Sequence, residues 1–466
     1  MAFTAPKPTL ITLPPRALSE PAGDIDRMHT VLTQSTPGAN VTCPPPAAIT
    51  RIVIKHMPDL AIPDHVPAHL VRHYDWADMQ GESDPYLHFA RLHDGPDIFY
   101  TPLHGGHWVF SRYEDLDYVY RNPELFSSRH ATVPVNPFII PLQEYDGSIH
   151  KDFRNALAPF FTPKSIGNLE QMARHLTTEL IDSFIGAGEC DFVVEFAQKM
   201  PIIILVRLLG IPQADVPTLM PLSEDIVRSV DERSQAEAFY KLVAYIRDNI
   251  LPARKAQPGT DVFSSIMQAR VDGGRPMTDD EIVGLGSLLI AAGLDTVASM
   301  LGFIVRFLAE SPTHRRQLIE TPALINEALE EMLRRFSLSN MARVATTDVT
   351  YKDILFKAGD IIFVSNTAAS IDPRHYPDPL AVDFKRADKK SMIFGRGPHQ
   401  CIGAFLARTE LRVFLQEWLR RIPDFSIKPN ARVVAVAGKA NAMRSLPITW
   451  PTTACVQTLK RAVGDQ

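Results

Sequence analysis

The sequence predicts a mainly α-helical domain with small β-sheets, and three patterns support this class. Segments with apolar residues at helical spacing dominate residues 165–310 and 404–421, with prolines between them. Short apolar runs such as 107–110 and 361–364 follow turns that contain glycine, and they predict short strands. A loop rich in glycine, 394–403, leads directly into the last predicted helix.

Composition restricts the class of protein. The chain has 466 residues, of which 45% are hydrophobic and 22% charged, and its formal net charge is -5. These values are typical of a mildly acidic soluble protein, and nothing in them indicates a nucleic-acid partner. Four cysteines, at 43, 190, 401 and 455, lie far apart without CxxC spacing, so we expect a reducing cytoplasm. We expect no secretory signal or membrane anchor, because the first thirty residues are polar and broken by prolines, and the longest apolar helix contains Asp295.

The chain divides into three segments. Residues 1–56 are rich in proline and show no sustained periodicity, so we expect a disordered N-terminal extension. Residues 57–450 contain the periodic segments and are expected to form a single domain. Residues 451–466 are expected to be a C-terminal tail.

The domain begins with short elements. We expect helices at 84–91 and 114–121, on either side of the strand at 107–110. Residues 133–142 are apolar but broken by prolines, which composition alone would explain as a surface loop with buried anchors. His150 and Arg154 then stand at i and i+4 on an expected helix, where they share one face and suit a carboxylate, although such residues are more often solvated.

The longest predicted helix, 279–310, has an unusual centre. Residues 288–297 are apolar nearly all round, which is typical of a buried helix, yet they include Asp295 and Thr296. The ordinary explanation is a hydroxyl bonded to the carbonyl at i−4 and an acid paired in the core. Further helices are expected at 169–185, at 192–209 with a break at Pro201, and at 215–230, 236–250 and 323–335.

One stripe of that helix carries small side chains. Leu288, Ala291, Ala292 and Thr296 fall on the same face at helical spacing. The small residues Ala292 and Gly293 would leave room for a small molecule against the helix. This stripe is therefore a candidate site.

Cys401 is the most distinctive residue of the chain. It ends a turn with two glycines and a proline and stands just before a helix that we expect at 404–421. The positive end of a helix lowers the pKa of a thiol and favours the thiolate, which is the form that binds metals. A lone cysteine is otherwise most often a small buried apolar residue.

Four separated motifs together resemble the cytochrome P-450 superfamily. Residues 394–403, Phe-Gly-x-Gly-x-His-x-Cys-x-Gly, match its haem-thiolate signature, and 292–296, Ala-Gly-x-Asp-Thr, resemble its oxygen-activation motif. Residues 331–334 resemble its Glu-x-x-Arg motif, and 150–154 resemble the helix that contacts a haem propionate. The resemblance implies the cytochrome P-450 fold, with haem b between the long central helix and the cysteine loop.

The resemblance also implies roles for single residues. Cys401 would be the axial metal ligand, Thr296 would hydrogen-bond the activated dioxygen, and Asp295 would relay protons. A buried carboxylate needs a partner, and the resemblance implies that Arg228 pairs with Asp295. The residues expected to bind the cofactor are His150, Arg154, Arg343, Phe394, His399 and Cys401.

Glu331 and Arg334 would form the buried structural pair of the family. An acid and an arginine at this spacing are more often a surface pair, and only the resemblance selects these two. Ala381 stands where the family usually has Arg or His to complete their network. We expect the network to be open or completed by another residue.

The soluble bacterial camphor hydroxylases, a class I group, are the branch most similar to this chain, through runs such as 334–338, 417–419 and 422–427. In that branch the loop at 133–142 covers the substrate and a tyrosine fixes the ketone, but a count without gaps places Phe138 there, with Tyr145 as the alternative source of a hydroxyl. We therefore expect poor binding of camphor and hydroxylation of a terpenoid or norisoprenoid such as ionone. The expected substrate residues are Phe138, Leu288, Ala291, Ala292, Ser339, Lys439 and Ala440.

The resemblance implies a monomeric monooxygenase that uses O2. The chain has no flavin, dinucleotide or iron–sulfur motif, so electrons would come from a two-iron two-sulfur ferredoxin and its NADH-dependent reductase. A peroxide-driven peroxygenase and a haem-based ligand sensor are the alternatives, and the acid–alcohol pair argues against both. An acidic ferredoxin could dock on a basic patch, although such charge runs are usually only solvated. The expected patch is Lys151, Arg154, Lys385, Arg386, Lys389, Lys390 and Arg396.

Overall fold

The computed structural model describes residues 62–79, 83–135, 139–228 and 232–452. The contacts of the chain divide it into residues 1–56 and 57–466, and all described residues belong to the second unit. The predicted extension, nearly all of the predicted tail and Phe138 lie outside the described residues.

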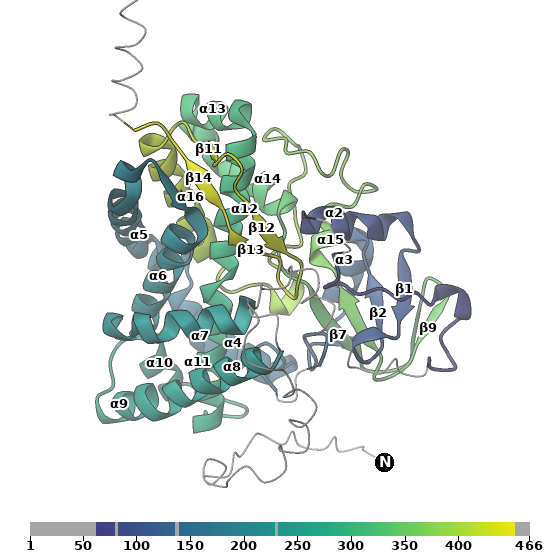
Figure 1. The fold of residues 1–466 in the computed structure, drawn as a ribbon. Coiled ribbons are helices and arrows are strands. Elements are labelled where there is room, and N and C mark those ends of the chain that lie inside the picture. Colours follow the sequence, from purple (N-terminus) through teal and green to yellow (C-terminus); the bar gives the residue numbers. More distant parts are fainter. Residues whose placement is uncertain (1–61, 80–82, 136–138, 229–231, 453–466) are drawn as a thin grey trace, which may run out of the picture. The chain divides into compact units, whose positions relative to one another are not determined.

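A five-stranded sheet lies beside the helices (Figure 1). Its order is β1 (Ile98–Thr101), β2 (His107–Phe110), β10 (Ile361–Val364), β7 (Met341–Ala345) and β3 (Phe126–Ser127). β2 and β10 pair in parallel, and the other pairs are antiparallel. The predicted strands at 107–110 and 361–364 are thus confirmed, because both are fully or almost fully buried apolar runs.

Several short hairpins and a small three-stranded sheet complete the β structure. In the three-stranded sheet, β14 (Pro447–Thr449) lies between β11 (Ser426–Ile427) and β4 (Glu189–Asp191). The hairpins are β5 (Arg270–Val271) with β6 (Arg275–Pro276), β8 (Val349–Tyr351) with β9 (Ile354–Phe356), and β12 (Val434–Val436) with β13 (Ala442–Ser445).

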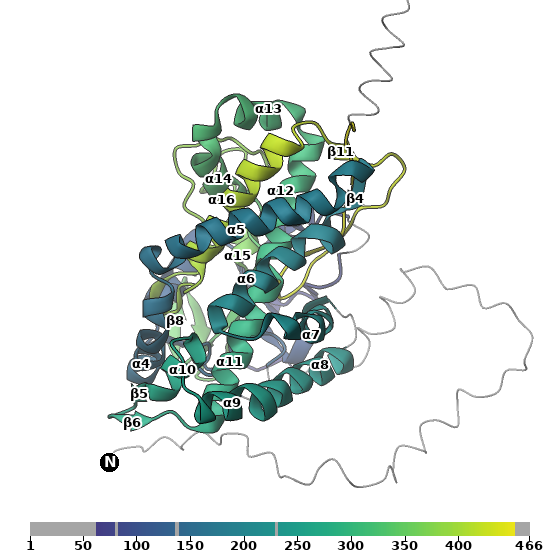
Figure 2. The same cartoon turned by 90° about the vertical axis from the view of Figure 1, so that its left-hand side faces the viewer.

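Helices form most of the domain. α5 (Pro163–Phe184) lies between α16 (Ala404–Arg421) and α6 (Lys199–Leu209), as Figure 2 shows. Trp418 of α16 is fully buried at this contact, where its ring lies 6.2 Å from the ring of Phe184 of α5. The other helices are α2 (Pro85–Ala90), α3 (Tyr113–Arg121), α4 (Gly147–Leu157), α7 (Val216–Arg228), α8 (Glu232–Tyr245), α9 (Leu251–Ala256), α10 (Val262–Gln268), α13 (Pro312–Glu320), α14 (Ile325–Arg335) and α15 (Asn366–Ala369).

The predicted long helix is divided in two at Asp295. α11 (Asp279–Leu294) begins with a capping box between Thr278 and Glu281, and α12 (Thr296–Glu310) follows directly. Asp295 has φ −111° and ψ −24°, outside regular helix, so a break separates the two. Within the described residues, Asp279–Glu310 has the length and hydropathy of a membrane span, but 71% of its most apolar window is buried inside the protein, as in a core helix.

The predicted break at Pro201 is wrong in position. A π-helical segment, Val193–Ala197, comes first, and α6 begins at Lys199, so Pro201 lies in the first turn of α6. A proline in the first turn removes no hydrogen bond of the helix, and it is therefore tolerated there. A second π-helical segment, Ile246–Ile250, joins α8 to α9.

Glu331 and Arg334 form the buried pair that the sequence predicts. Both side chains are 0% exposed, and two hydrogen bonds of 2.8 and 2.9 Å join them. The network is completed by Arg386, whose Nε donates to Glu331 Oε1 at 3.0 Å. Arg386 also donates to the carbonyl of Ala381, the position where the sequence predicts a gap. Arg386 is therefore held inside the fold, and its place in the predicted basic patch is wrong.

Candidate functional site

The loop before Cys401 has a fixed backbone. The Cys401 N–H donates to the carbonyl of Phe394 at 2.8 Å, which closes the loop just before α16. Gly395 and Gly397 have φ of +62° and +68°, in the left-handed region. A Cβ on Gly397 would also collide with the backbone carbonyl of Tyr120 at the end of α3, whereas Gly395 has open space around it. Both the left-handed backbone and the contact with Tyr120 therefore require glycine at 397.

The pKa of the Cys401 thiol differs from the sequence prediction. Cys401 is an exposed residue, but protein atoms crowd around its sulfur and raise this pKa, while the N–H of Gly403 and the charges of Arg154 and Arg408 lower it. The crowding is the larger effect, so the helix terminus alone does not produce a thiolate. A coordinated metal ion deprotonates a thiol outright, which makes the sulfur of Cys401 suited to a metal rather than to free nucleophilic chemistry.

Four predicted cofactor-binding side chains come together beside this loop. His150 and Arg154 project from α4, Arg343 from β7, and His399 from the loop. The rings of His150 and His399 lie 3.9 Å apart between their centroids. The buried Arg343 lies over the ring of Tyr120, 5.0 Å from its centroid, and Arg154 is close enough for its charge to act on Cys401.

The electrostatics of this cluster indicate an anion site. Burial lowers the pKa of Arg154, Arg343 and His399, and burial with the nearby charges of His399 and Arg154 lowers the pKa of His150 to about 4. Asp146 accepts a hydrogen bond from His399 at 3.1 Å, but no carboxylate of the described residues pairs with either arginine. The buried Nε2 of His150 has no described partner.

These residues fit a haem. A buried group of cations with too few acids is stabilised by added negative charge, and two propionates supply it. The sulfur of Cys401 lies beside the same group and supplies the soft ligand that iron accepts. The guanidinium of Arg408 lies over the ring of Phe394, 4.5 Å from its centroid, at the start of the cysteine loop.

The central stripe of α11 and α12 is accessible, as the sequence predicts. Leu288 and Ala291 are partly exposed, and Ala292 and Thr296 are exposed, whereas Leu289 and other residues on the remaining faces are buried. The Thr296 hydroxyl donates to the carbonyl of Ala292 at 3.0 Å. This is the ordinary i−4 bond that the sequence allowed, and it leaves the oxygen lone pairs on the accessible face.

Asp295 is buried at the junction of the two helices. Its side chain is 4% exposed, and Oδ2 accepts a hydrogen bond from Ser299 at 3.0 Å. The expected partner Arg228 has a side chain outside the described residues, so that pairing stays a prediction.

The structure brings together three of the predicted substrate residues. Ser339 and Ala440 form an isolated β-bridge, and the exposed Lys439 lies next to it. The hydroxyl of Ser339 donates to the carbonyl of Ile393, directly before the cysteine loop, at 3.3 Å. Tyr145, the alternative source of a hydroxyl, is buried with its ring against Phe153.

Sequence reasoning missed two residues of the site. Asp146 caps the cluster by accepting hydrogen bonds from His399, Ser127 and Ser128. Asp146 stands four residues before His150, and this spacing could have indicated that it lies close to the cluster. Arg408 forms two hydrogen bonds with Glu330, of 2.6 and 3.0 Å, and only the fold reveals this pairing.

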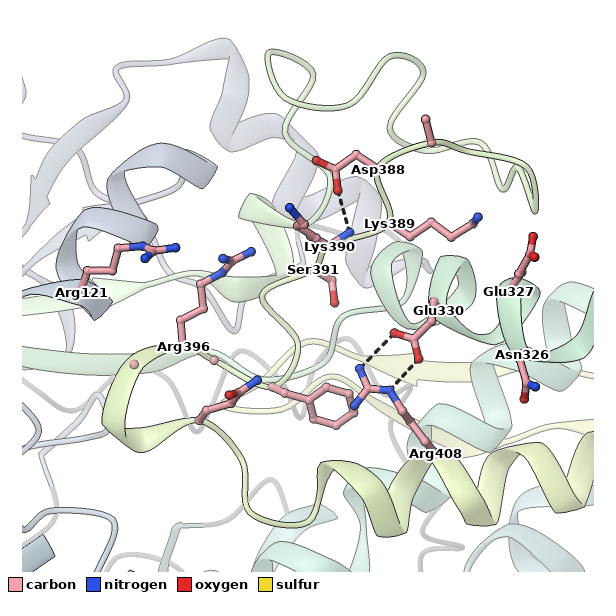
Figure 3. Close-up of a pocket in the computed structure, with 15 residues that line it drawn as sticks. Arg121, Asn326, Glu327, Glu330, Asp388, Lys389, Lys390, Ser391, Arg396 and Arg408 are labelled. Atoms are coloured by element: carbon pink, nitrogen blue, oxygen red, sulfur yellow. Dashed lines mark hydrogen bonds and ion pairs between the residues drawn. The ribbon is translucent and has the colours of Figure 1, made fainter. Parts of the chain in front are cut away.

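A pocket of about 790 Å³, lined mostly by charged and polar residues, lies on the cysteine loop (Figure 3). Figure 3 shows Lys390 and Arg396 on one side and the Glu330–Arg408 pair on the other. The lining residues are Arg121, Asn326, Glu327, Glu330, 387–391, 394–397, Gln400 and Arg408.

The chain is similar to known proteins over most of its length. Residues 321–433 match the family model described as Cytochrome P450. The chain is 34% identical to "Probable cytochrome P450 127A1" of Sinorhizobium fredii over 405 residues, which are 84% of this chain and 97% of that protein. The crystal structures of CYP101J2 and CYP101C1 each match with a TM-score of 0.77 and 32% identity, over 84% of this chain and 100% of theirs.

We predict that Gly397→Ala destabilises the protein more than Gly395→Ala. Each alanine adopts a left-handed backbone, which costs about 1–2 kcal/mol, but only Gly397→Ala also collides with the carbonyl of Tyr120. Urea unfolding should give a loss of about 1 kcal/mol for Gly395→Ala and at least about twice that for Gly397→Ala. Equal losses would show that the Tyr120 contact is unimportant.

Proposed function

We propose a specific reaction for this chain, which belongs to the cytochrome P450 family of haem b monooxygenases: hydroxylation of a small hydrophobic terpenoid or norisoprenoid with O2 and electrons from a ferredoxin. The predicted fold, the haem cofactor and the resemblance to bacterial relatives of the camphor-hydroxylase type are confirmed by the similarity to these relatives. The observation that carries the proposal is the accessible Ala292 and Thr296 stripe on an otherwise buried helix.

Each part of the cofactor has suitable residues in this chain. Cys401 would ligate the iron, and Arg154, Arg343 and His399 would bind the propionates through charge-assisted hydrogen bonds, with His150 beside them. Haem with a thiolate ligand supplies the dioxygen chemistry that inserts one oxygen atom into a C–H bond. The protein contributes position, charge and control of water.

Thr296 and Asp295 would control protons. The Thr296 hydroxyl lies on the accessible face of the helix and can hold a proton at Oγ1. Asp295 lies next to it at the helix break and is buried, and its Oδ2 accepts from Ser299. A carboxyl group that can lose and regain a proton, placed behind a hydroxyl group, is the pattern of a short proton relay.

Substitution of Thr296 tests this relay. Thr296→Ala removes the hydroxyl, so we expect NADH consumption to continue while product per NADH falls at least about tenfold and hydrogen peroxide accumulates. Thr296→Ser keeps the hydroxyl and should stay close to the wild type. Unchanged coupling in the alanine variant would remove Thr296 from the mechanism. Full turnover of the wild type with hydrogen peroxide alone would favour the peroxygenase. No turnover with O2 and NADH or with hydrogen peroxide would favour the sensor.

The substrate proposal rests on small and apolar side chains. Leu288, Ala291 and Ala292 line the accessible stripe and offer no hydrogen-bond donor from their side chains. Ser339 and Ala440 meet near the cysteine loop, where the related camphor hydroxylases are expected to have larger apolar residues. A pocket of this kind favours a compact hydrocarbon with few polar groups.

A further prediction concerns which ligand the site binds. Titration of the ferric protein should produce a large spin-state shift with β-ionone and a weak one with camphor. The small residues Ser339 and Ala440 enlarge the pocket for the longer ionone, while phenylalanine at 138 leaves camphor without the hydroxyl that fixes its ketone. Loss of one such hydrogen bond costs about 1 kcal/mol, or roughly fivefold in affinity. A full shift with camphor that disappears in Tyr145→Phe would show instead that Tyr145 binds the ketone.

The electron donor is proposed to dock beside the cysteine loop. Lys385 and Lys390 are exposed, and Lys389 is partly exposed. Arg396 is already engaged, because it donates to the Tyr113 hydroxyl and lies 3.3 Å from Asp117. The lysines are therefore the main charges available for an acidic two-iron two-sulfur ferredoxin, supplied by an NADH-dependent reductase. We also propose that the protein is a cytoplasmic monomer.

Charge reversal tests this docking surface. Lys390→Glu should slow reduction by an acidic ferredoxin several-fold at low salt, and the difference should shrink at 0.5 M salt because the interaction is screened. Lys241→Glu makes the same charge change on α8, away from the pocket, and should have little effect. Equal effects of both variants, or reduction that does not depend on salt, would contradict this docking surface.

A further inference from the structure

A buried carboxylate anchors the loop formed by residues 139–142. Glu144 is 4% exposed, and its two oxygens accept hydrogen bonds from this loop and from Ala131. Oε1 accepts from the N–H of Ala131 at 3.2 Å, and Oε2 accepts from the N–H of Ile140 at 2.9 Å. The Glu144 N–H also donates to the carbonyl of Ile140 at 2.9 Å. Residues 131 and 140 are thus fixed relative to each other by one side chain.

The same loop rests on a glycine of α11. A Cβ on Gly284 would lie 2.8 and 2.9 Å from the Cδ and Cγ atoms of Pro141. The proline ring is bonded to its own backbone nitrogen and cannot rotate away, so a methyl group at 284 must move the backbone of the loop. Pro141 is buried, and the approach of loop and helix is therefore as close as glycine allows.

Gly284 belongs to the accessible stripe of the central helix. Gly284 and Ala291 are seven residues apart, which places them within about 20° of each other around the helix, and Leu288 lies between them along the axis, so Gly284 shares the face of the stripe. Accessibility along this face increases from the partly exposed Gly284 and Leu288 to the exposed Ala292 and Thr296. At 1.5 Å per residue, Gly284 lies about 12 Å from Ala292 along the helix. The loop thus limits the stripe at its N-terminal end.

We propose that Gly284 and Glu144 are positioning residues that determine substrate size, by fixing the loop against the end of the stripe. This inference rests on the proposed function for its importance, because the stripe is where we place the substrate. A side chain at 284 would lift the loop, lengthen the stripe beyond Leu288 and favour larger ligands over compact ones. Weakening the Glu144 hydrogen bonds would release the same loop from its other contact.

The test uses two azoles that ligate haem iron whatever the natural substrate is. Imidazole is small and reports access to the iron, whereas 4-phenylimidazole also needs space along the stripe. Absorption titrations of the holoenzyme give both dissociation constants, and their ratio is the readout. Loss of stability or of haem affects both ligands alike, while a displaced loop changes the ratio.

Gly286→Ala is the matched control for Gly284→Ala. It adds the same methyl group to the same helix about 200° away, where it meets Phe263 instead of the loop. We expect Gly284→Ala to shift the ratio at least about threefold toward 4-phenylimidazole and Gly286→Ala to leave it unchanged. Adding Pro141→Ala to Gly284→Ala removes the proline ring, and it should bring the ratio of dissociation constants most of the way back to the wild-type value.

Glu144→Gln tests the second positioning residue and serves if Gly284→Ala does not fold. The amide keeps one acceptor oxygen but turns an NH2 group toward a backbone N–H, so one hydrogen bond is lost at constant volume. The same direction of shift is expected. Ratios within about 1.5-fold of the wild type in both variants, or an equal shift in Gly286→Ala, would overturn the inference. Failure to hydroxylate terpenoids while the ratio still shifts would refute the proposed function alone.

Discussion

Buried positive charge is the constraint on which the site depends. Arg154 and Arg343 carry this charge beside the rings of His150 and His399. The four residues come from three separate elements, and Asp146 is the one acid among the described residues that bonds to any of them. Such a group is costly to enclose without anions, and burial lowers the pKa of all four side chains. The helix α4, the strand β7 and the cysteine loop are therefore stable together chiefly when a dianionic cofactor lies among them.

Local patterns made much of this site predictable. The glycines of the cysteine loop, the bounds of α16 at Ala404 and Arg421, and the accessible face of α11 follow from backbone preference and helical period. The break at Asp295 did not, because Asp295 stands in an unbroken apolar pattern and its φ and ψ depend on packing. The raised pKa of Cys401 was also missed, since the crowding around its sulfur is a property of the whole fold.

Contacts between distant residues account for the other differences. Arg386 appeared to be one of several surface cations, but it completes the Glu331 network because the chain folds back over α14. The approach of Pro141 to Gly284 and the two hydrogen bonds of Glu144 join positions that no periodicity relates. Charge runs and loops are therefore the features whose roles sequence reasoning assigns least well, since the partner decides the role.

Gly397 packs against the backbone of Tyr120, although the two are far apart in the chain. The Tyr120 hydroxyl donates to Asn366, and its ring lies under Arg343, so one tyrosine joins α3, α15 and β7 to the cysteine loop. Contacts between residues so far apart in the sequence cost chain entropy, and only the interactions of the assembled domain offset this cost. Capture of the haem is consequently tied to global folding, and a destabilising substitution far from the iron can appear first as loss of the cofactor's colour.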